Sequence, residues 1–300
     1  MADCYRQRTG GQRPMLDPER LAGDVATLVS LPEVVVRINE LVEDPQSSAE
    51  DIGRVVAQDT ALTARLLTLA NSALFGLSRK VDTIGRAIAV LGTHQVRDLT
   101  LGLSAARAFN GIPNSLVSMG SFWHHSVLCA VAARLVAGSC VRGRPDSSFV
   151  AGLLHDVGQL VLFNKLPEQS RTALAMTVMA PDEPDLHVCE QRILGFDHAA
   201  VGGALARRWR LPPSLAESIE FHHDPARARS HPLDVAVVHI ANSVAVLAEL
   251  ESERWEDAAV IQPVAWEITG LARGQALACA AAACDAAEDV KTLFQLPGLH

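Results

Sequence analysis

The sequence predicts an all-α fold without a β-sheet, built as an N-terminal helical bundle packed on a second helical bundle. Aromatic residues make up 4% of the 300 residues and Tyr occurs once, so aromatic strand formers are scarce while Ala is abundant. Apolar residues recur at spacings of three and four along several segments, which is the period of a helix. Pairs such as Asp17-Pro18 and Asp44-Pro45 occur at short intervals and are typical of helix starts and breaks.

Composition and charge restrict the class of protein. Hydrophobic residues make up 49% and charged residues 20% of the chain, as in a folded globular protein of about two domains. The formal net charge is −8 and no stretch places Lys and Arg beside aromatics, so nucleic acid is not an expected partner. The longest apolar runs fall short of the roughly 20 residues of a membrane span, and no secretory signal is recognisable. We expect a cytoplasmic protein without membrane contact.

Residues 1–16 are expected to be a disordered leader, and residues 17–112 an N-terminal helical bundle. Asp59 can cap a helix in which Leu62, Leu66 and Leu69 form one apolar stripe. Ser47 and Glu50 have the spacing of a capping box. The expected helices cover residues 18–30, from 32 to the break at 44–45, around 52–56, 60–74, 83–91 and 93–109.

The remaining chain is expected to form a second helical bundle and an extension. Gly111, Pro113 and Asn114 mark a boundary, and residues 113–250 form the second bundle, which holds most of the histidines. A break rich in Pro and charge precedes a C-terminal helical extension over residues 251–300, in which Gly270 or Gly274 interrupts the last helix. The six cysteines are scattered without a C-x-x-C pair and are expected to be reduced thiols.

A group of polar residues lies within strongly apolar helical segments of the second bundle. An unpaired imidazole or carboxylate costs several kcal/mol to bury, so the group must either hydrogen-bond mutually or hold a metal. Because adjacent helical side chains diverge, we expect His124 and His223 in an outer layer or at the surface. The residues expected to converge in one pocket are His125, His155, Asp156, His198 and His222.

Several short motifs occur in a fixed order along residues 24–225. They include Asn71-Ser72-Ala73-Leu74-Phe75-Gly76, Trp123-His124-His125-Ser126, Gly152-Leu153-Leu154-His155-Asp156-Val157-Gly158, His198-Ala199-Ala200-Val201-Gly202 and Trp209-Arg210-Leu211-Pro212. This order resembles the HD metal-dependent phosphohydrolase superfamily, and the finer pattern is similar to its HDOD branch. The resemblance implies an all-helical bacterial signal-transduction module, usually regarded as an output or scaffold domain without hydrolase chemistry.

Three departures separate the sequence from the related HD-GYP cyclic-di-GMP phosphodiesterases. Gln159 stands where their motif has Lys, Asp224-Pro225 follows His223 without a G-Y-P segment, and Asn242 stands where a late Asp ligand is expected. Lys would supply a positive charge for phosphate, and Asp would supply an anionic oxygen. The resemblance therefore implies a metal site with His125, His155, Asp156, His198 and His222 as ligands, with His223 and Asn242 as additional candidates.

Two functions fit these observations. The first is a non-catalytic signalling module that acts through contacts with other signalling proteins, with a homodimer as a further option. The second is a metal-dependent phosphohydrolase that acts on a nucleotide or cyclic nucleotide, in which a metal polarises phosphate. The absence of a Gly-rich phosphate cradle and of Lys at position 159 favours the first. Iron, zinc, manganese or nickel would suit a cluster of histidines with one carboxylate.

Overall fold

The computed structural model describes residues 17–26, 32–109, 115–179, 185–258 and 260–291. These ranges contain helices and no strand, so the predicted all-α fold is confirmed for the described part of the chain. Residues 1–16, expected as a leader, and residues 292–300 lie outside the described residues. The division into 17–112, 113–250 and 251–300 remains a prediction.

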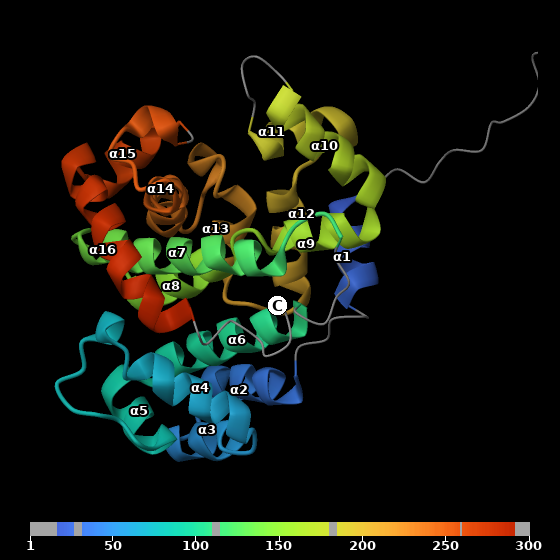
Figure 1. Cartoon of the computed structure of the whole chain (residues 1–300). Helices are drawn as coiled ribbons and strands as arrows, with labels where there is room; N and C mark the ends of the chain where they lie inside the picture. The colour runs from blue at the N-terminus through green and yellow to red at the C-terminus, as the bar shows by residue number, and fades with distance from the viewer. Residues whose placement is uncertain (1–16, 27–31, 110–114, 180–184, 259, 292–300) are drawn as a thin grey trace, which may run out of the picture.

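The first part of the chain packs around one long helix, α6, as the lower half of Figure 1 shows. Its elements are α2 (Glu33–Glu43), α3 (Ala49–Val56), α4 (Thr60–Ala70), the short 3-10 helix η1 (Ala73–Phe75), α5 (Ile84–Leu91) and α6 (Thr93–Phe109). Helices α2, α4 and α5 each contact α6. The first helix, α1 (Pro18–Ala26), packs instead on the second part of the chain, against α9 and α12.

The second part is organised around α7, which contacts α8, α14 and α16. Its elements are α7 (Met119–Gly138), α8 (Pro145–Leu154), α9 (Val157–Lys165), α10 (Pro167–Met179), α11 (Leu186–Leu194), α12 (His198–Arg208), α13 (Pro213–Phe221), η2 (Pro225–Arg227), α14 (Pro232–Glu249), η3 (Trp255–Asp257), α15 (Pro263–Thr269) and α16 (Arg273–Lys291). Among the described residues, only α14 is long and apolar enough to cross a membrane, and 67% of it is buried inside the protein. Its hydrophobicity is therefore that of a core helix.

Local sequence signals place several helix ends. Asp59 caps α4 as expected, accepting a hydrogen bond from Leu62 N at 2.9 Å. The expected capping box of Ser47 and Glu50 is wrong by one residue, because Ser48 and Asp51 form it. Gly270, with φ of 68°, ends α15 in the left-handed conformation that glycine tolerates.

Helix α4 ends at Ala70, earlier than the expected Leu74, because Asn71 terminates it. The amide Nδ2 of Asn71 donates to the carbonyls of Leu67 and Val81, each at 2.7 Å. Its Oδ1 accepts from Val81 N at 2.7 Å. Asn71 therefore stops the helix and fixes the loop that follows η1.

The two parts of the chain meet at the first turn of α8. Ser147 donates to the buried Asp98 of α6 at 3.2 Å, and Asp98 accepts from Arg97 Nε at 2.8 Å. Arg134 of α7 donates to Asp146 in the same turn of α8 and stacks over the Phe75 ring of η1 at 4.1 Å. These polar contacts fix α8 between α6 and α7.

Helices α9 and α12 approach each other so closely that only glycine fits at Gly158. A Cβ atom at this position would lie 1.9 Å from the carbonyl oxygen of His198 and 2.7 Å from Gly202 N. Real Cβ atoms do not approach backbone atoms this closely. Gly158 therefore allows the first turn of α12, which carries His198, to lie against the start of α9.

We expect Gly158→Ala to lower the free energy of unfolding by about 1–3 kcal/mol, because the added methyl group forces α9 and α12 apart. The matched control is Gly85→Ala in α5, where a Cβ meets nothing within 4 Å. This control should be neutral or stabilising by up to about 1 kcal/mol. Urea unfolding of both variants measures the difference, and equal stabilities would contradict the close approach.

Candidate metal centre

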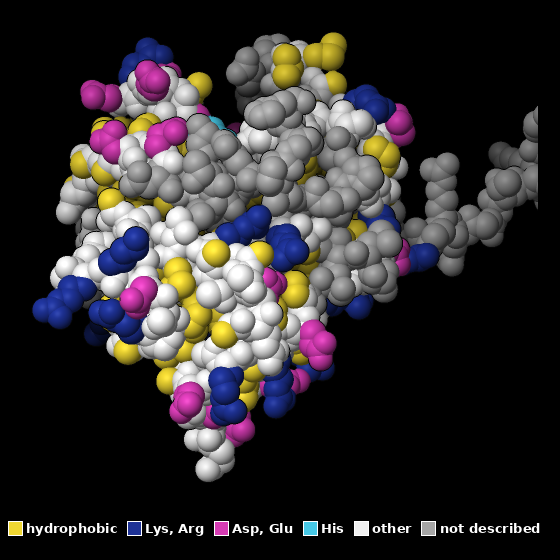
Figure 2. All heavy atoms as spheres, turned by 60° about the horizontal axis from the view of Figure 1, so that its bottom comes forward, with side chains coloured by type: hydrophobic (Ala, Val, Ile, Leu, Met, Phe, Trp, Pro, Cys, Tyr) yellow, Lys and Arg dark blue, Asp and Glu magenta, His cyan; other side chains and the backbone are white. Residues whose placement is uncertain are grey.

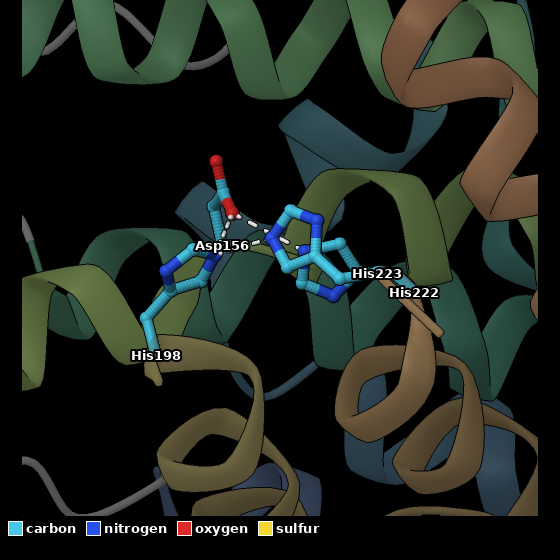
Figure 3. A group of neighbouring side chains, drawn as sticks. All are labelled: Asp156, His198, His222 and His223. Atoms are coloured by element: carbon cyan, nitrogen blue, oxygen red, sulfur yellow. Dashed lines mark hydrogen bonds and ion pairs between the residues drawn. The ribbon is translucent and has the colours of Figure 1, made fainter. Parts of the chain in front are cut away.

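The five residues expected to converge lie together around the carboxylate of Asp156. Asp156 Oδ1 lies 3.1 Å from His198 Nε2 and 3.6 Å from His222 Nε2. Asp156 Oδ2 lies 3.3 Å from His155 Nε2 and 4.0 Å from His125 Nε2. Figure 3 shows Asp156 with His198 on one side and His222 on the other. The predicted convergence is confirmed, while metal binding by these residues remains a prediction.

Most of these residues lie at helix ends and not within helices. His155 follows the last residue of α8, and Asp156 precedes the first residue of α9. His198 is the first residue of α12, and His222 follows the last residue of α13. The chain turns at these points, so His155 and Asp156 can both face the cluster although they are adjacent in sequence.

The last turns of α8 and α13 orient two imidazole rings in the same way. His155 Nδ1 donates to the carbonyl of Gly152 at 2.7 Å, and His222 Nδ1 donates to the carbonyl of Ile219 at 2.8 Å. Carbonyl groups in the last turn of a helix have no partner within the helix, so they are free to accept these bonds. In both rings Nδ1 therefore carries a proton, and Nε2 points toward Asp156.

Glu190 of α11 orients the third ring. Its Oε2 accepts from His198 Nδ1 at 2.6 Å and from His198 N at 2.8 Å. Glu190 is 1% exposed, so this is a buried carboxylate held by one histidine. A carboxylate behind an imidazole is a common outer partner of a metal-bound histidine. Its place eight residues before His198 is set by the turn between α11 and α12.

Two buried nitrogens at the centre, His155 Nε2 and His222 Nε2, have no hydrogen-bond partner, and Asp156 Oδ1 has only its contacts with the rings of His198 and His222. Buried polar atoms without partners are rare in folded proteins and need an explanation such as an ion. Nitrogen and carboxylate oxygen donors suit iron, zinc, manganese and nickel. The residues present therefore fit a divalent metal ion, which would bind to the Nε2 atoms and to Asp156.

The structure corrects the expected position of His223. It was expected in an outer layer or at the surface, but its Nε2 lies 2.9 Å from His198 Nε2, inside the cluster. The expectation assumed a continuous helix, whereas α13 has already ended at Phe221. His187 of α11, which the sequence analysis did not include, stacks on His223 with ring centroids 3.9 Å apart. His124 is half-buried.

Asn242 and Glu249 of α14 both contact His125. Asn242 Oδ1 lies 3.0 Å from His125 Nε2, and Glu249 Oε2 lies 3.2 Å from His125 Nδ1. Seven residues separate the two positions, which places both on one face of the helix. Sequence reasoning included Asn242 but missed Glu249, because an acidic residue at the end of a helix carries no distinctive signal.

The buried charges shift one another's pKa values. Burial raises the pKa of Asp156, but His155, His198 and His222 lower it more, so it lies well below its ordinary value. Burial lowers the pKa of His198, but Glu190 and Asp156 raise it to about 10. Burial and the charge of His155 lower the pKa of His222 to about 4, against the opposing effect of Asp156. Without a metal, the positive charges of protonated imidazoles therefore balance the negative charge of Asp156.

A family model of the HDOD domain matches residues 28–225. The chain belongs to the HDOD family. This domain match covers the helices that carry every ligand candidate except Asn242, including the His155-Asp156 pair.

Two solved structures share the HDOD fold over nearly the whole chain. An HDOD domain protein of unknown function from Geobacter sulfurreducens is 24% identical, with a TM-score of 0.69 and coverage of 92% of this chain and 97% of its own. A Shewanella amazonensis SB2B protein, provisionally named a phosphohydrolase, is 22% identical, with a TM-score of 0.70 and coverage of 92% and 98%.

A curated relative places the domain in a longer protein. An uncharacterized protein of Treponema pallidum (strain Nichols) is 27% identical over 205 residues, which is 68% of this chain. The match spans 39% of that protein's length.

The raised pKa of His198 predicts how the stability of the metal-free domain depends on pH. The unfolded-state pKa of histidine is about 6.5, and the folded-state value is about 10. Stabilisation by a group with a raised folded-state pKa is fully present below the unfolded pKa and is lost as the pH rises through the folded pKa. We expect the metal-free protein to lose about 2 kcal/mol or more between pH 7 and pH 10 through this residue.

Urea unfolding in the presence of a chelator measures this loss. His198→Asn is the matched control, because it removes the titrating ring and should show a shallower decline over the same range. A wild-type profile parallel to that of the control would contradict a proton shared between His198, Glu190 and Asp156.

Proposed function

We propose that this HDOD domain is a non-catalytic, metal-binding signal-transduction module that acts in the cytoplasm through contacts with other proteins. In this proposal the ion has a structural role and holds the ends of α8, α12 and α13 together. Iron, zinc, manganese or nickel fits the donors.

The observation that carries the proposal is the burial of four candidate ligands, whereas the side chain of His125 is 20% exposed. His155 and His222 are 0% exposed, His198 is 1% exposed and Asp156 is 7% exposed. Their Nε2 atoms face Asp156 from different helices. Structural metal sites are closed by protein ligands, whereas catalytic sites keep an open position for water or substrate. The burial of this cluster supports a structural role.

The composition of the cluster also supports a role without hydrolysis. Asn242 offers a neutral carbonyl oxygen, already within 3.0 Å of His125 Nε2, in the position where an aspartate would supply a negative charge. Gln159, at the start of α9, has no positive charge for a phosphate group. Both differences weaken the electrostatic stabilisation on which phosphate hydrolysis depends.

The proposed partners are other signalling proteins, with a second copy of this chain as an option. The proposed contact surfaces are those of residues 17–112 and of the chain from residue 251. Figure 2 shows the face formed by the first helices, where apolar side chains lie between charged side chains of both signs. Val36 of α2 and Val90 of α5 are among the exposed apolar residues. A mixed surface of this kind suits protein contacts better than a nucleic acid.

A metal-dependent phosphohydrolase is the second candidate, and one geometric feature favours it. Two groups of possible ligands share Asp156: one with His198, His222 and His223, and the other with His125 and His155. Two ions joined by a shared carboxylate are common in enzymes that cleave phosphate esters. The provisional name of the Shewanella amazonensis SB2B protein is consistent with this candidate.

Metal analysis of the protein purified without an affinity tag or chelator tests the proposed ion. We expect at least about one divalent ion per chain, and loss of most of it in His155→Ala, because removal of a ligand lowers the affinity of a metal site strongly. His124→Ala is the matched control, since it removes a neighbouring histidine of the same α7 segment as His125. Equal metal content in both variants would contradict the assignment.

Hydrolysis of cyclic-di-GMP by the metal-loaded protein separates the two candidates. We expect no turnover above the metal-free background, because Gln159 and Asn242 lack the charges that phosphate transfer needs. The measurement is product formation with each of the four metals. Turnover that Asp156→Asn abolishes would reverse the choice and favour the phosphohydrolase.

A further inference from the structure

Helices α10 and α11 bury few of their side chains. The 13 residues of α10 bury Ser170 and Ala173, and the nine residues of α11 bury Cys189 and Glu190. The two helices pack on each other at the upper right of Figure 1. Segments that bury few apolar side chains open more easily than the core around them. Besides the packing of α10 on α9, these two helices therefore depend on a small number of specific contacts with the rest of the bundle.

Glu190 makes two of these contacts. Its Oε2 accepts two hydrogen bonds from His198, one from the backbone N and one from Nδ1. The neighbouring Gln191 donates to Asp197 Oδ2 at 2.7 Å and so reinforces the same junction with α12. Glu190 is 1% exposed, and a carboxylate is costly to bury unless it is paired. The two hydrogen bonds from His198 therefore stabilise Glu190 in the protein interior.

The same histidine belongs to the metal cluster through its other nitrogen. His198 Nε2 lies 3.1 Å from Asp156 Oδ1 and 2.9 Å from His223 Nε2. A metal ion on Nε2 requires the proton of the ring to be on Nδ1, where it is donated to Glu190. The ion makes this N–H group a stronger donor, and the carboxylate makes the ring a stronger ligand.

We propose that Glu190 is a positioning residue that couples metal binding to the docking of α10 and α11. A bound ion holds the helix pair against α12 through His198, and loss of the ion releases it. Because binding free energies are reciprocal, docking of α11 also raises the affinity for the metal. This inference rests on the metal binding that the proposed function includes. It goes further by identifying α10 and α11 as the helices that respond to the ion.

Hydrogen exchange of the full chain, measured with and without Zn²⁺ as the probe, tests the coupling without any variant. We expect exchange in peptides from residues 186–194 to slow by about tenfold or more when Zn²⁺ binds, since the ion strengthens the contact that docks α11. Peptides from α6, residues 93–109, serve as the internal reference because they lie in the first bundle. Their exchange should change much less.

The variant Glu190→Gln tests whether Glu190 is the residue that couples Zn²⁺ binding to the docking of α11. Glutamine keeps an oxygen acceptor for His198 but removes the charge, so we expect Zn²⁺ to bind about 10–100-fold more weakly and to protect α11 less. The matched control is Glu168→Gln on α10, whose side chain is 79% exposed and forms an ion pair with Arg171 on the same helix. It should leave both the Zn²⁺ affinity and the exchange of α11 unchanged.

The outcomes separate this inference from the proposed function. Zn²⁺ binding with unchanged exchange in residues 186–194 would overturn the coupling and leave metal binding intact. Unchanged Zn²⁺ affinity in Glu190→Gln would overturn the role of Glu190. Failure of the wild-type chain to bind Zn²⁺ or any of the other metals would overturn both proposals. Slower exchange of residues 186–194 in the Zn²⁺-bound wild type, together with weaker Zn²⁺ binding by Glu190→Gln, would support the coupling.

Discussion

The need to balance the negative charge of one buried carboxylate determines how the helices of the second bundle are arranged. Asp156 is 7% exposed, and an isolated negative charge at such a depth is strongly unfavourable. Imidazoles from three other helix ends face it, and they hold its pKa well below the ordinary value. Each imidazole is in turn held by an acceptor behind it: Gly152 O, Ile219 O or Glu190. The carboxylate, the rings and these acceptors form one connected unit in which each part needs the others.

Helix ends are suited to building such a unit. A side chain in the middle of a helix has its direction fixed by neighbours on both sides, whereas the residue after a last turn can bend back to that turn. His155 and His222 do this in the same way, each donating to the carbonyl three residues before it. The close contact of Gly158 with His198 then brings a third helix end to the same point. The geometry of the cluster thus follows from where helices stop and from one position without a side chain.

The sequence was sufficient to predict the class of fold from short-range patterns. The convergence of the ligand candidates was predicted from such patterns together with the order of motifs in which the chain resembles the HD superfamily. Apolar periodicity and Pro or Asp signals predict helices, and polar residues in apolar segments predict a buried cluster. The errors have a common cause, which is the extrapolation of regular helices to their ends. His223 was expected to diverge from His222, but α13 had already ended. Glu190 belongs to the motif pattern that carried the family resemblance, but its contact with His198 depends on the turn between α11 and α12. His187 and Glu249 reach the cluster through packing between helices, and their spacing in the sequence gives no sign of it.

The charges around the cluster also explain why carboxylates lie behind the rings. A divalent ion bound by neutral imidazoles and by Asp156 alone would leave a net positive charge in a buried site. Asn242 adds an oxygen but no charge, so it does not remove this excess. Glu190 behind His198 and Glu249 behind His125 add negative charge without entering the site. In the absence of an ion, the same carboxylates favour protonated rings, as the pKa of about 10 for His198 shows. Protons and metal ions are therefore alternative ways to meet one electrostatic requirement, and a metal must displace the protons to bind.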